Sequence, residues 1–509
     1  MSDKAIVKSA GVIGGATSLS RVLGFFRDII IAAFLGTGAA AQAFVVAFRI
    51  PNLIRNLAGE GAANSAVVPV LTECLQRDKA DFRRLACLLF ALVAIVLAAI
   101  VFLGLVFAPS IVRFIAPGFA ANGDKFILTT RLTRLMFPYL FLVGLSALAM
   151  GVLNSRRYFA IPALGPCLFN LALIGGGLIA LSRGRDVMVL GWAVLVGGAL
   201  QLGIQIPLLR REAFYSLDLC WRGDITERVK RRVKEIGCLL LPRMLGSGVY
   251  LLNIFVDTVL ASLAWIVGDG GVAAIYYASR LIQLPLAIFG FAFSQAALPV
   301  MSAYAARGEK GRLRQSLYFT LKRVFLFIIP SAVGLAMLAG PIINALFERG
   351  KFGPYSTAIT SSALSFYALG LPAYAAGKIL SSCFYALKDT RSPVKSAGIS
   401  LLVNIAFNLF FIGKMKIAGL ALASSLAAFV NVVILYKMLI KKIGLGGVDY
   451  RALFGFVLRI ILSAAVMVGF IWFIRPFLIG FSPVLGLAVV IFAAGGVFFA
   501  AAAILKCLH

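Results

Sequence analysis

Long apolar segments recur from one end of this 509-residue chain to the other, and they determine which solvent its surface must face. A helix of about 20 apolar residues crosses the ~30 Å hydrocarbon core of a bilayer. Hydrophobic residues make up 61% of the chain and charged residues 13%, so a soluble fold could not cover its apolar surface. Lipid also requires every backbone polar group to be satisfied internally. The sequence therefore predicts an all-α membrane protein.

The apolar segments, separated by turn and charge clusters, predict about 14 transmembrane helices. They are expected at residues 10–36, 39–73, 84–108, 126–153, 161–182, 187–209, 236–265, 271–302, 315–340, 357–387, 394–413, 417–440, 452–474 and 483–506. The second segment would be ~52 Å long as one helix, which exceeds the hydrocarbon core. It must tilt, kink or protrude, and Pro51 is a natural site for a kink.

The sequence repeats itself weakly at an offset of about 230 residues, or about six helices. Ser20–Gly24 is similar to Pro242–Gly246, for example, and Ala47–Arg49 to Ala278–Arg280. Chance similarity among apolar helices is the alternative explanation. An even number of helices per repeat predicts two parallel-repeat, six-helix lobes and two further C-terminal helices. The expected parts are an N-terminal lobe (1–222), a cytoplasmic amphipathic helix (223–235), a C-terminal lobe (236–445) and the last two helices (446–509).

Basic residues in the loops predict the orientation of the chain. With the N-terminus inside, roughly thirty of them face the cytoplasm and about eleven face the other side. This asymmetry predicts a multi-pass membrane protein with both termini cytoplasmic. The basic segment 223–235 is expected to lie on the membrane surface as a short helix, and a solvated run of charges is the alternative.

Cationic side chains inside the predicted helices are the strongest indication of function. A charged residue at the centre of a membrane helix costs ~2.5–3.5 kcal/mol, so seven would cost on the order of 20 kcal/mol if they faced lipid. The seven are Arg21, Arg27, Arg49, Arg55, Arg243, Arg280 and Lys378. The nearby acids Asp28, Glu60 and Asp257 are too few to neutralise them. A hydrated cationic cavity between the lobes is therefore predicted, and guanidinium groups suit an anionic, phosphate-bearing substrate.

Each of these residues also has a purely structural interpretation. Arg49 or Arg243 could reach a membrane interface, and Asp28 could be only a counter-ion for Arg27. Asp257 could be a cation site or a partner of Arg243, and the partner role is the preferred one. Lys378 could line the cavity or form a salt bridge between the lobes.

Enzymatic and nucleic-acid functions find no support in the sequence. The net charge of +30 would suggest nucleic acid in a soluble protein, but here the basic residues orient helices. There is no nucleotide-binding loop, no metal-ligand cluster and no nucleophile paired with a base. We expect a transporter without a cofactor. The sequence does not identify a coupling ion.

Several segments resemble the MurJ (MviN) family of the multidrug/oligosaccharidyl-lipid/polysaccharide exporter superfamily. They are Ser20–Asp28, Ala43–Arg55, Glu60–Ala62, Ala116–Ala120, Tyr276–Leu281 and Phe384–Lys395. The resemblance covers essentially the whole chain. It implies a flippase for lipid II, the undecaprenyl-diphosphate-linked precursor of peptidoglycan. It also implies that the last two helices form a hydrophobic groove for the lipid tail.

The resemblance also assigns residues to the substrate site. By the family pattern, the cavity residues that engage the diphosphate and sugar are Arg21, Arg27, Arg49, Arg55 and Arg280. Asp28, Asn52 and Glu60 take supporting cavity positions, and we count Asn52 with the substrate-binding residues. Arg243 and Lys378 are supporting candidates from the membrane argument alone. Gln42 and Ser279 stand where relatives carry acids, which leaves an ion-coupling or gating role there open.

The expected mechanism is alternating access, in which the lobes rock and move lipid II from the inner to the outer leaflet. Lipid II and membrane lipids are the expected partners, with other cell-wall synthesis proteins as further candidates and no nucleic acid. Another lipid-linked oligosaccharide, of O-antigen or teichoic type, is the alternative substrate. A cation-coupled drug exporter would need an acidic cavity, a scaffold would tolerate charge reversal at Arg27 or Arg280, and a membrane enzyme would need a reactive set of residues.

Overall fold

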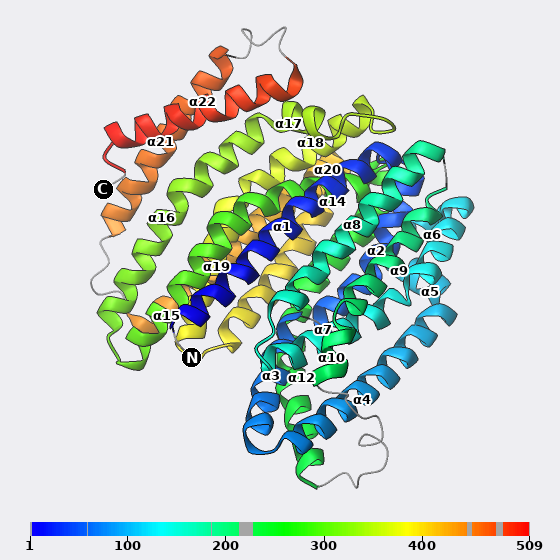
Figure 1. Cartoon of the computed structure of the whole chain (residues 1–509). Helices are drawn as coiled ribbons and strands as arrows, with labels where there is room; N and C mark the ends of the chain where they lie inside the picture. The colour runs from blue at the N-terminus through cyan, green and yellow to red at the C-terminus, as the bar shows by residue number, and fades with distance from the viewer. Residues whose placement is uncertain are drawn as a thin grey trace. The chain divides into compact units, whose positions relative to one another are not determined.

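The computed structural model describes residues 3–58, 60–184, 186–212, 227–444, 450–474 and 482–507 (Figure 1). The side chains of residues 3–10, 12–13, 54–66, 227–228, 230, 239–247, 249–250 and 450–454 lie outside this description. Throughout the described ranges the secondary structure is helical, without strands, as predicted. Nine described helices are long and apolar enough to cross a membrane, and α18 and α19 form one further bent pair. The count of 14 stays a prediction.

The chain divides into two units, Met1–Leu251 and Leu252–His509, which we call the N-terminal and C-terminal units. The helices of the N-terminal unit are α1 (Asp3–Leu35), α2 (Ala39–Ala58), α3 (Glu60–Arg77), α4 (Lys79–Val106), α5 (Ala108–Ile115), η1 (Pro117–Ala121), α6 (Gly123–Met136), α7 (Tyr139–Ser155), α8 (Ala160–Arg183), α9 (Met188–Gly203) and α10 (Ile206–Glu212). Helix α12 (Glu227–Ala261) contains the boundary between the units.

The helices of the C-terminal unit are α13 (Ala264–Val267), α14 (Gly271–Pro285), η2 (Leu286–Phe291), α15 (Ala292–Ala306), α16 (Lys310–Met337), α17 (Ala339–Phe347), α18 (Pro354–Leu369), α19 (Leu371–Ala386), α20 (Arg391–Ile443), α21 (Tyr450–Ile474) and α22 (Pro483–Ile504). Helices α21 and α22 pack against each other and against α16 (Figure 1).

Prolines account for several differences between the predicted and observed helices. The segment 126–153 is broken at Pro138 into α6 and α7, because proline cannot donate the helical hydrogen bond. A bend of 45° separates α18 from α19, which has Pro372 in its first turn. A π-helical turn, η2, follows Pro285 at the end of α14. The segment 39–73 forms α2 and α3, and α2 continues beyond Pro51 to Ala58.

The segment 223–235 was expected to be a separate surface helix, and this prediction was wrong for its described part. From Glu227 onward it is the first part of α12, which continues to Ala261. Val229 and Ile236 are buried in a cluster with apolar residues of α3, α4 and α7. Arg232 donates from Nη2 to Oε1 of Glu73 in α3, at 2.6 Å. These contacts hold the basic segment against the N-terminal unit.

Helix α20 contains 53 residues, but it folds as an antiparallel hairpin that turns at Lys416, whose φ is 52° and ψ −127°. Ser396 donates to the Asn431 side chain at 2.6 Å, Ser400 to the Ala427 carbonyl at 2.8 Å, and Asn404 to Ser424 at 3.2 Å. The residue numbers of the bonded partners rise along the first arm and fall along the second, as they must between antiparallel helices. The two arms are the segments predicted as helices at 394–413 and 417–440.

Turns of the same kind stand at corresponding places in the two units, after α7 and after α19. After α7, Arg157 has φ 67°, and the nitrogens of Arg157 and Tyr158 donate to the carbonyls of Asn154 and Leu153. After α19, Lys388 has φ 58°, and the nitrogens of Lys388 and Asp389 donate to the carbonyls of Tyr385 and Phe384. Each position in the second turn lies 231 residues after its counterpart in the first. We call these two segments the repeated turns.

An ion pair joins each repeated turn to a later helix of its own unit, with opposite polarity. In the N-terminal unit Arg156 donates from Nε to Glu212 at the end of α10, at 2.8 Å, and the Tyr158 hydroxyl donates to the same carboxylate at 3.0 Å. In the C-terminal unit Asp389 accepts from Lys442 at the end of α20. The acid is on the later helix in one unit and in the turn in the other.

Candidate functional site

Arg27 and Asp28 on α1 form a buried ion pair in the N-terminal unit and are 8% and 3% exposed. Arg27 donates to Oδ1 of Asp28 from Nε at 3.0 Å and from Nη2 at 2.8 Å. Its Nη1 donates to Oδ1 of Asn170 on α8 at 2.9 Å. Asn170 in turn donates from Nδ2 to the carbonyl of Ser20, at 2.9 Å, and to its hydroxyl, at 3.2 Å. The guanidinium is therefore fixed from two helices.

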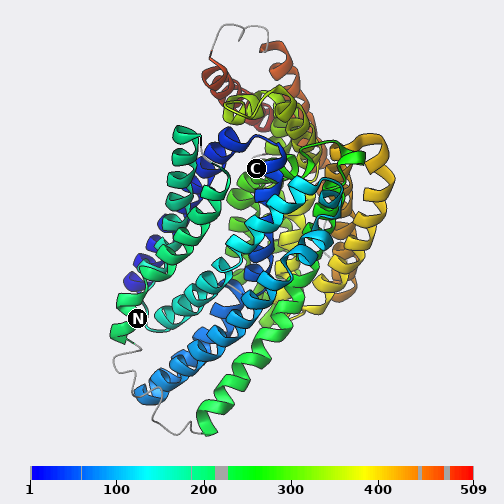
Figure 2. The same ribbon diagram turned by 90° about the vertical axis from the view of Figure 1, so that its right-hand side faces the viewer.

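Close packing of α8 brings Asn170 to this position. The glycines at 176 and 177 allow the approach, because a Cβ on Gly177 would lie 2.6 Å from Ile30 and one on Gly176 would lie 2.5 Å from Ala193. These contacts place α8 against α1 on one side and against α9 on the other, and the two views of the fold agree (Figures 1 and 2).

The other predicted residues of the N-terminal unit have different environments. Arg21 is exposed on α1, and Arg49 is half-buried on α2. Asn52 is also half-buried, and its amide donates to the Phe48 carbonyl of its own helix at 2.9 Å. Of the residues predicted for the site in this unit, Arg27 and Asp28 are the pair that the structure brings into direct contact.

Three predicted residues lie outside the described side chains: Arg55, Glu60 and Arg243. Their backbones belong to α2, α3 and α12.

In the C-terminal unit, Arg280 on α14 lies over the ring of Tyr276, with its central carbon 4.8 Å from the ring centre. Its Nη2 donates to the Tyr276 hydroxyl at 3.1 Å, and its Nη1 to Gln283 at 3.4 Å. This stacking suits a guanidinium that must remain available to an anion, because it orients the group without neutralising its charge.

Lys378 lies near the middle of α19 and is exposed. Its Nζ is 4.7 Å from the ring centre of Phe291, the last residue of η2. Ser279 donates to the Tyr276 carbonyl at 2.8 Å, within its own helix. Gln42 is 2% exposed, and within the described part of the chain its amide nitrogen has no acceptor.

Asp257 belongs to a buried polar cluster that was not predicted from the sequence. Asn408 donates to Oδ1 of Asp257 at 3.1 Å, and Ser424 to Oδ2 at 3.2 Å. Asn404 accepts from Asn408 at 2.8 Å and donates to Ser424 at 3.2 Å. The cluster joins α12 to both arms of α20. Two asparagines four residues apart in an apolar helix were the available sequence signal, as they share one helix face.

No group of three or more metal-ligating His, Cys, Asp or Glu residues occurs in the described ranges. The arrangement around Arg27 is suited to holding a cation in an apolar protein and offering its remaining donors to an anion. A guanidinium has five N–H groups. Asp28 and Asn170 accept one hydrogen bond from each of its three nitrogens, which leaves one N–H group on each of the two terminal nitrogens.

Comparison with known proteins adds an independent finding. The model of the family described as "Lipid II flippase MurJ" matches residues 31–492. A probable lipid II flippase MurJ of Rhizobium meliloti (strain 1021) is 36% identical over 474 residues, which is 91% of this chain and 85% of the relative. The lipid II flippase MurJ of Burkholderia cenocepacia is 34% identical over 434 residues, or 84% of this chain and 83% of that protein.

Solved structures are similar over the same extent. A lipid II flippase MurJ in an inward closed conformation superposes with a TM-score of 0.78 at 26% identity, over 97% of this chain and 98% of the other. An inward-facing multidrug resistance MATE family transporter of the MOP superfamily gives a TM-score of 0.70 at 19% identity, over 83% of this chain and 95% of the other. The second likeness concerns the fold alone.

Proposed function

Because the chain belongs to the MurJ lipid II flippase family, we propose that it moves lipid II from the inner to the outer leaflet of the bacterial inner membrane. It is a multi-pass membrane transporter rather than an enzyme. The family match, which extends over residues 31–492, is the observation that carries the substrate assignment.

We infer that Arg27 binds the diphosphate of lipid II. A buried guanidinium in a membrane helix is costly unless an anion compensates for it. Asp28 supplies that anion at rest, and the N–H groups that Asp28 and Asn170 leave unused can donate to phosphate oxygens. The substrate would then add to the pre-oriented group without breaking its contacts.

Arg280 supplies a second cation, from the C-terminal unit, and Tyr276 orients it. In the mechanism that we propose, both arginines belong to one hydrated cavity, together with Arg21, Arg49, Arg55 and Asn52. Asp28, Glu60, Arg243 and Lys378 support that cavity. The lobes rock to expose it alternately to the two sides of the membrane.

The test is to supply this chain to cells depleted of their own flippase and to measure surface-exposed lipid II. We expect the wild-type chain to restore both growth and surface lipid II. Arg27→Gln and Arg280→Gln should restore neither. A matched control is Arg459→Gln, because Arg459 is an exposed arginine of α21 whose contacts are the carbonyls of Gly455 and Leu505.

Failure of the wild-type chain to restore surface lipid II, at normal membrane abundance, would refute the assignment. If it instead restored export of an O-antigen or teichoic lipid-linked oligosaccharide, the substrate would be of that type. Equal rescue by the Arg27→Gln and wild-type chains would refute the role of the arginine but leave the substrate assignment intact.

A further inference from the structure

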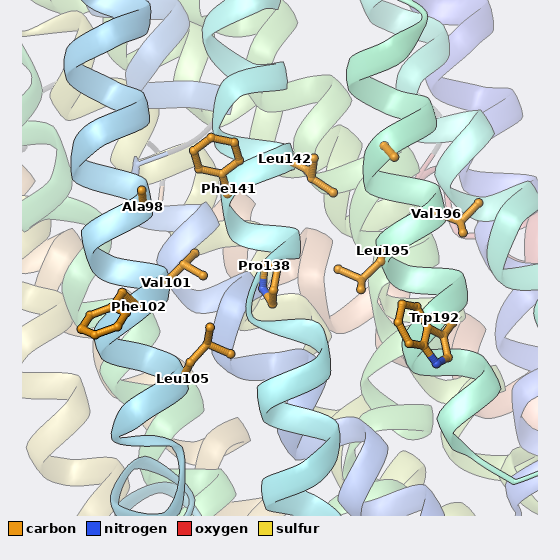
Figure 3. A pocket seen from close by; sticks show the side chains of 11 residues that line it. Ala98, Val101, Phe102, Leu105, Pro138, Phe141, Leu142, Trp192, Leu195 and Val196 are labelled. Atoms are coloured by element: carbon orange, nitrogen blue, oxygen red, sulfur yellow. The ribbon is translucent and has the colours of Figure 1, made fainter.

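An apolar groove opens on the N-terminal unit, among three membrane-spanning segments (Figure 3). Its volume is about 640 Å³, within the size range of small-molecule sites. Figure 3 shows side chains of α4, α7 and α9 around a common space, with Pro138 of the α6–α7 break between them. The side chains that define its ends and walls include Ala98, Phe102, Leu105, Trp192 and Ala199.

The position of the groove along the helices places it in one half of the membrane. Its α4 residues, 98–105, are close to the end of that helix at Val106. Its α9 residues, 192–199, lie in the first half of the membrane-span candidate Met188–Glu212. Trp192, 59% exposed, has the amphipathic character of residues that gather at membrane interfaces. A hydrocarbon chain from the leaflet on that side matches the apolar lining of the groove.

The side chain of Arg134 lies at the end of the groove where α4 ends. Arg134, in the last turn of α6, is exposed and donates from Nε to the carbonyl of Leu105 at 3.2 Å. Within the described part of the chain, Nε is the nitrogen of Arg134 that donates a hydrogen bond. Its two terminal amino groups remain for an acceptor, and a guanidinium donates such a pair to a phosphate in parallel.

We propose that this groove binds a phospholipid of net negative charge, with an acyl chain between α4 and α9 and its phosphate on Arg134. The apolar groove matches an acyl chain, and the positive charge of Arg134 at its rim matches an anionic headgroup. This site rests on different residues from the transport site. It does not depend on the proposed function.

Quenching of Trp192 by brominated lipid tests the proposal, because bromine in an acyl chain quenches only a nearby indole. The variant Trp221→Phe/Trp265→Phe/Trp472→Phe leaves Trp192 as the only tryptophan of the four. It is reconstituted in phosphatidylcholine vesicles that contain either brominated phosphatidylglycerol or brominated phosphatidylcholine as the minor component. The ratio of the two quenching curves gives the relative affinity for the anionic lipid.

We expect a preference of about five-fold for phosphatidylglycerol at Trp192, since one arginine near a membrane surface contributes on that scale. Arg134→Gln should reduce the ratio to about one, whereas Arg131→Gln, on the same helix and also exposed, should preserve it. Ala98→Phe/Ala199→Phe fills the groove and should abolish the preference. A reporter that keeps Trp472 alone, which is 78% exposed on α21, should show no preference.

An equal ratio for the two lipids at Trp192 would overturn the proposal, as would a preference unaffected by Arg134→Gln. Displacement of the brominated lipid by a polyisoprenyl phosphate at lower concentration than by phosphatidylglycerol would also overturn it, because the groove would then belong to the transported class. Circular dichroism and detergent elution of each variant ensure that a lost preference reflects the site rather than misfolding.

Discussion

The side chain of Arg27 is held by one carboxylate and one amide, and these two partners have different consequences when they are lost. Asp28 compensates for the charge, whereas Asn170 fixes its direction and connects it to Ser20. Removing one partner of a buried ion pair leaves an uncompensated charge, but replacing both by apolar residues is often neutral for stability. Structural and functional roles can therefore be separated at this site.

We expect Asp28→Asn to destabilise the protein by about 3–5 kcal/mol, because Arg27 is 8% exposed and would keep its charge. The double variant Arg27→Met/Asp28→Leu should regain most of that stability and still fail to flip lipid II. Thermal unfolding in detergent and the surface lipid II assay measure the two effects. A double variant that flips lipid II would show that the pair is only structural.

Asn170 is expected to act as a positioning residue for Arg27. Asn170→Ala removes an acceptor from a buried guanidinium and should cost roughly 1–3 kcal/mol and reduce flipping. Asn170→Asp keeps an acceptor for Arg27 and should retain more activity than Asn170→Ala at equal abundance. Equal loss in the two variants would mean that the donor bonds to Ser20, rather than the orientation of Arg27, are what matter.

At the scale of single elements, the α20 hairpin depends on a close approach of its two arms. A Cβ on Gly419 would lie 2.7 Å from the Phe411 carbonyl oxygen, a backbone atom that cannot move aside. On the other side of the turn, a Cβ on Gly413 would meet only open space. The two glycines therefore differ in what faces them.

Gly419→Ala should therefore lower stability by about 1–3 kcal/mol through overpacking. Gly413→Ala should be neutral or slightly stabilising, because alanine favours the helix. Thermal unfolding of the two purified variants against wild type checks this pair. Equal stability of the variants would contradict the hairpin contact.

The repeated turn of the C-terminal unit predicts a dependence of stability on pH. Burial raises the pKa of the Asp389 carboxyl, but hydrogen bonds from Lys442 and Ser392 outweigh this effect, and the pKa is held below its usual value of 3.8. A lowered pKa means that the stabilisation is fully present above the usual value and is lost as the pH falls below it. We expect wild type to be more stable than Asp389→Asn at pH 7, with a difference that shrinks below about pH 4. Unfolding temperatures measured across that range provide the test.

The elements also show what sequence reasoning could and could not find. Helix positions follow from apolar periodicity and were predicted well, including the two arms of α20 on either side of Lys416. The short basic segment before α12 was misassigned, because its charges were visible but its burial against Glu73 and the α3–α4–α7 cluster required tertiary contacts. Arg27 and Asp28 were predictable from the cost of charge in lipid. Asn170, 143 residues away from Arg27, was not, because one asparagine in an apolar helix gives no indication of its partner.

At the scale of the whole molecule, the distribution of basic residues leads to a prediction about orientation. Loops on one side carry most of them, and this bias sets which side faces the cytoplasm. Lys310, at the start of α16, and Lys351, between α17 and α18, fall on opposite predicted sides.

A cysteine at either position, in a chain whose own seven cysteines are replaced, would report the side. A membrane-impermeant maleimide should label Lys351→Cys in intact spheroplasts. It should label Lys310→Cys only after permeabilisation. Labelling of Lys310→Cys from outside would contradict the orientation with both termini cytoplasmic.

Two similar halves on one polypeptide create a hazard during synthesis, since a segment of one half can dock where its counterpart belongs. The opposite polarity of the two turn–helix ion pairs works against such an exchange. An exchanged pairing would bring Arg156 close to Lys442, which has the same charge. We expect this repulsion to disfavour the exchanged pairing of the N-terminal turn during folding.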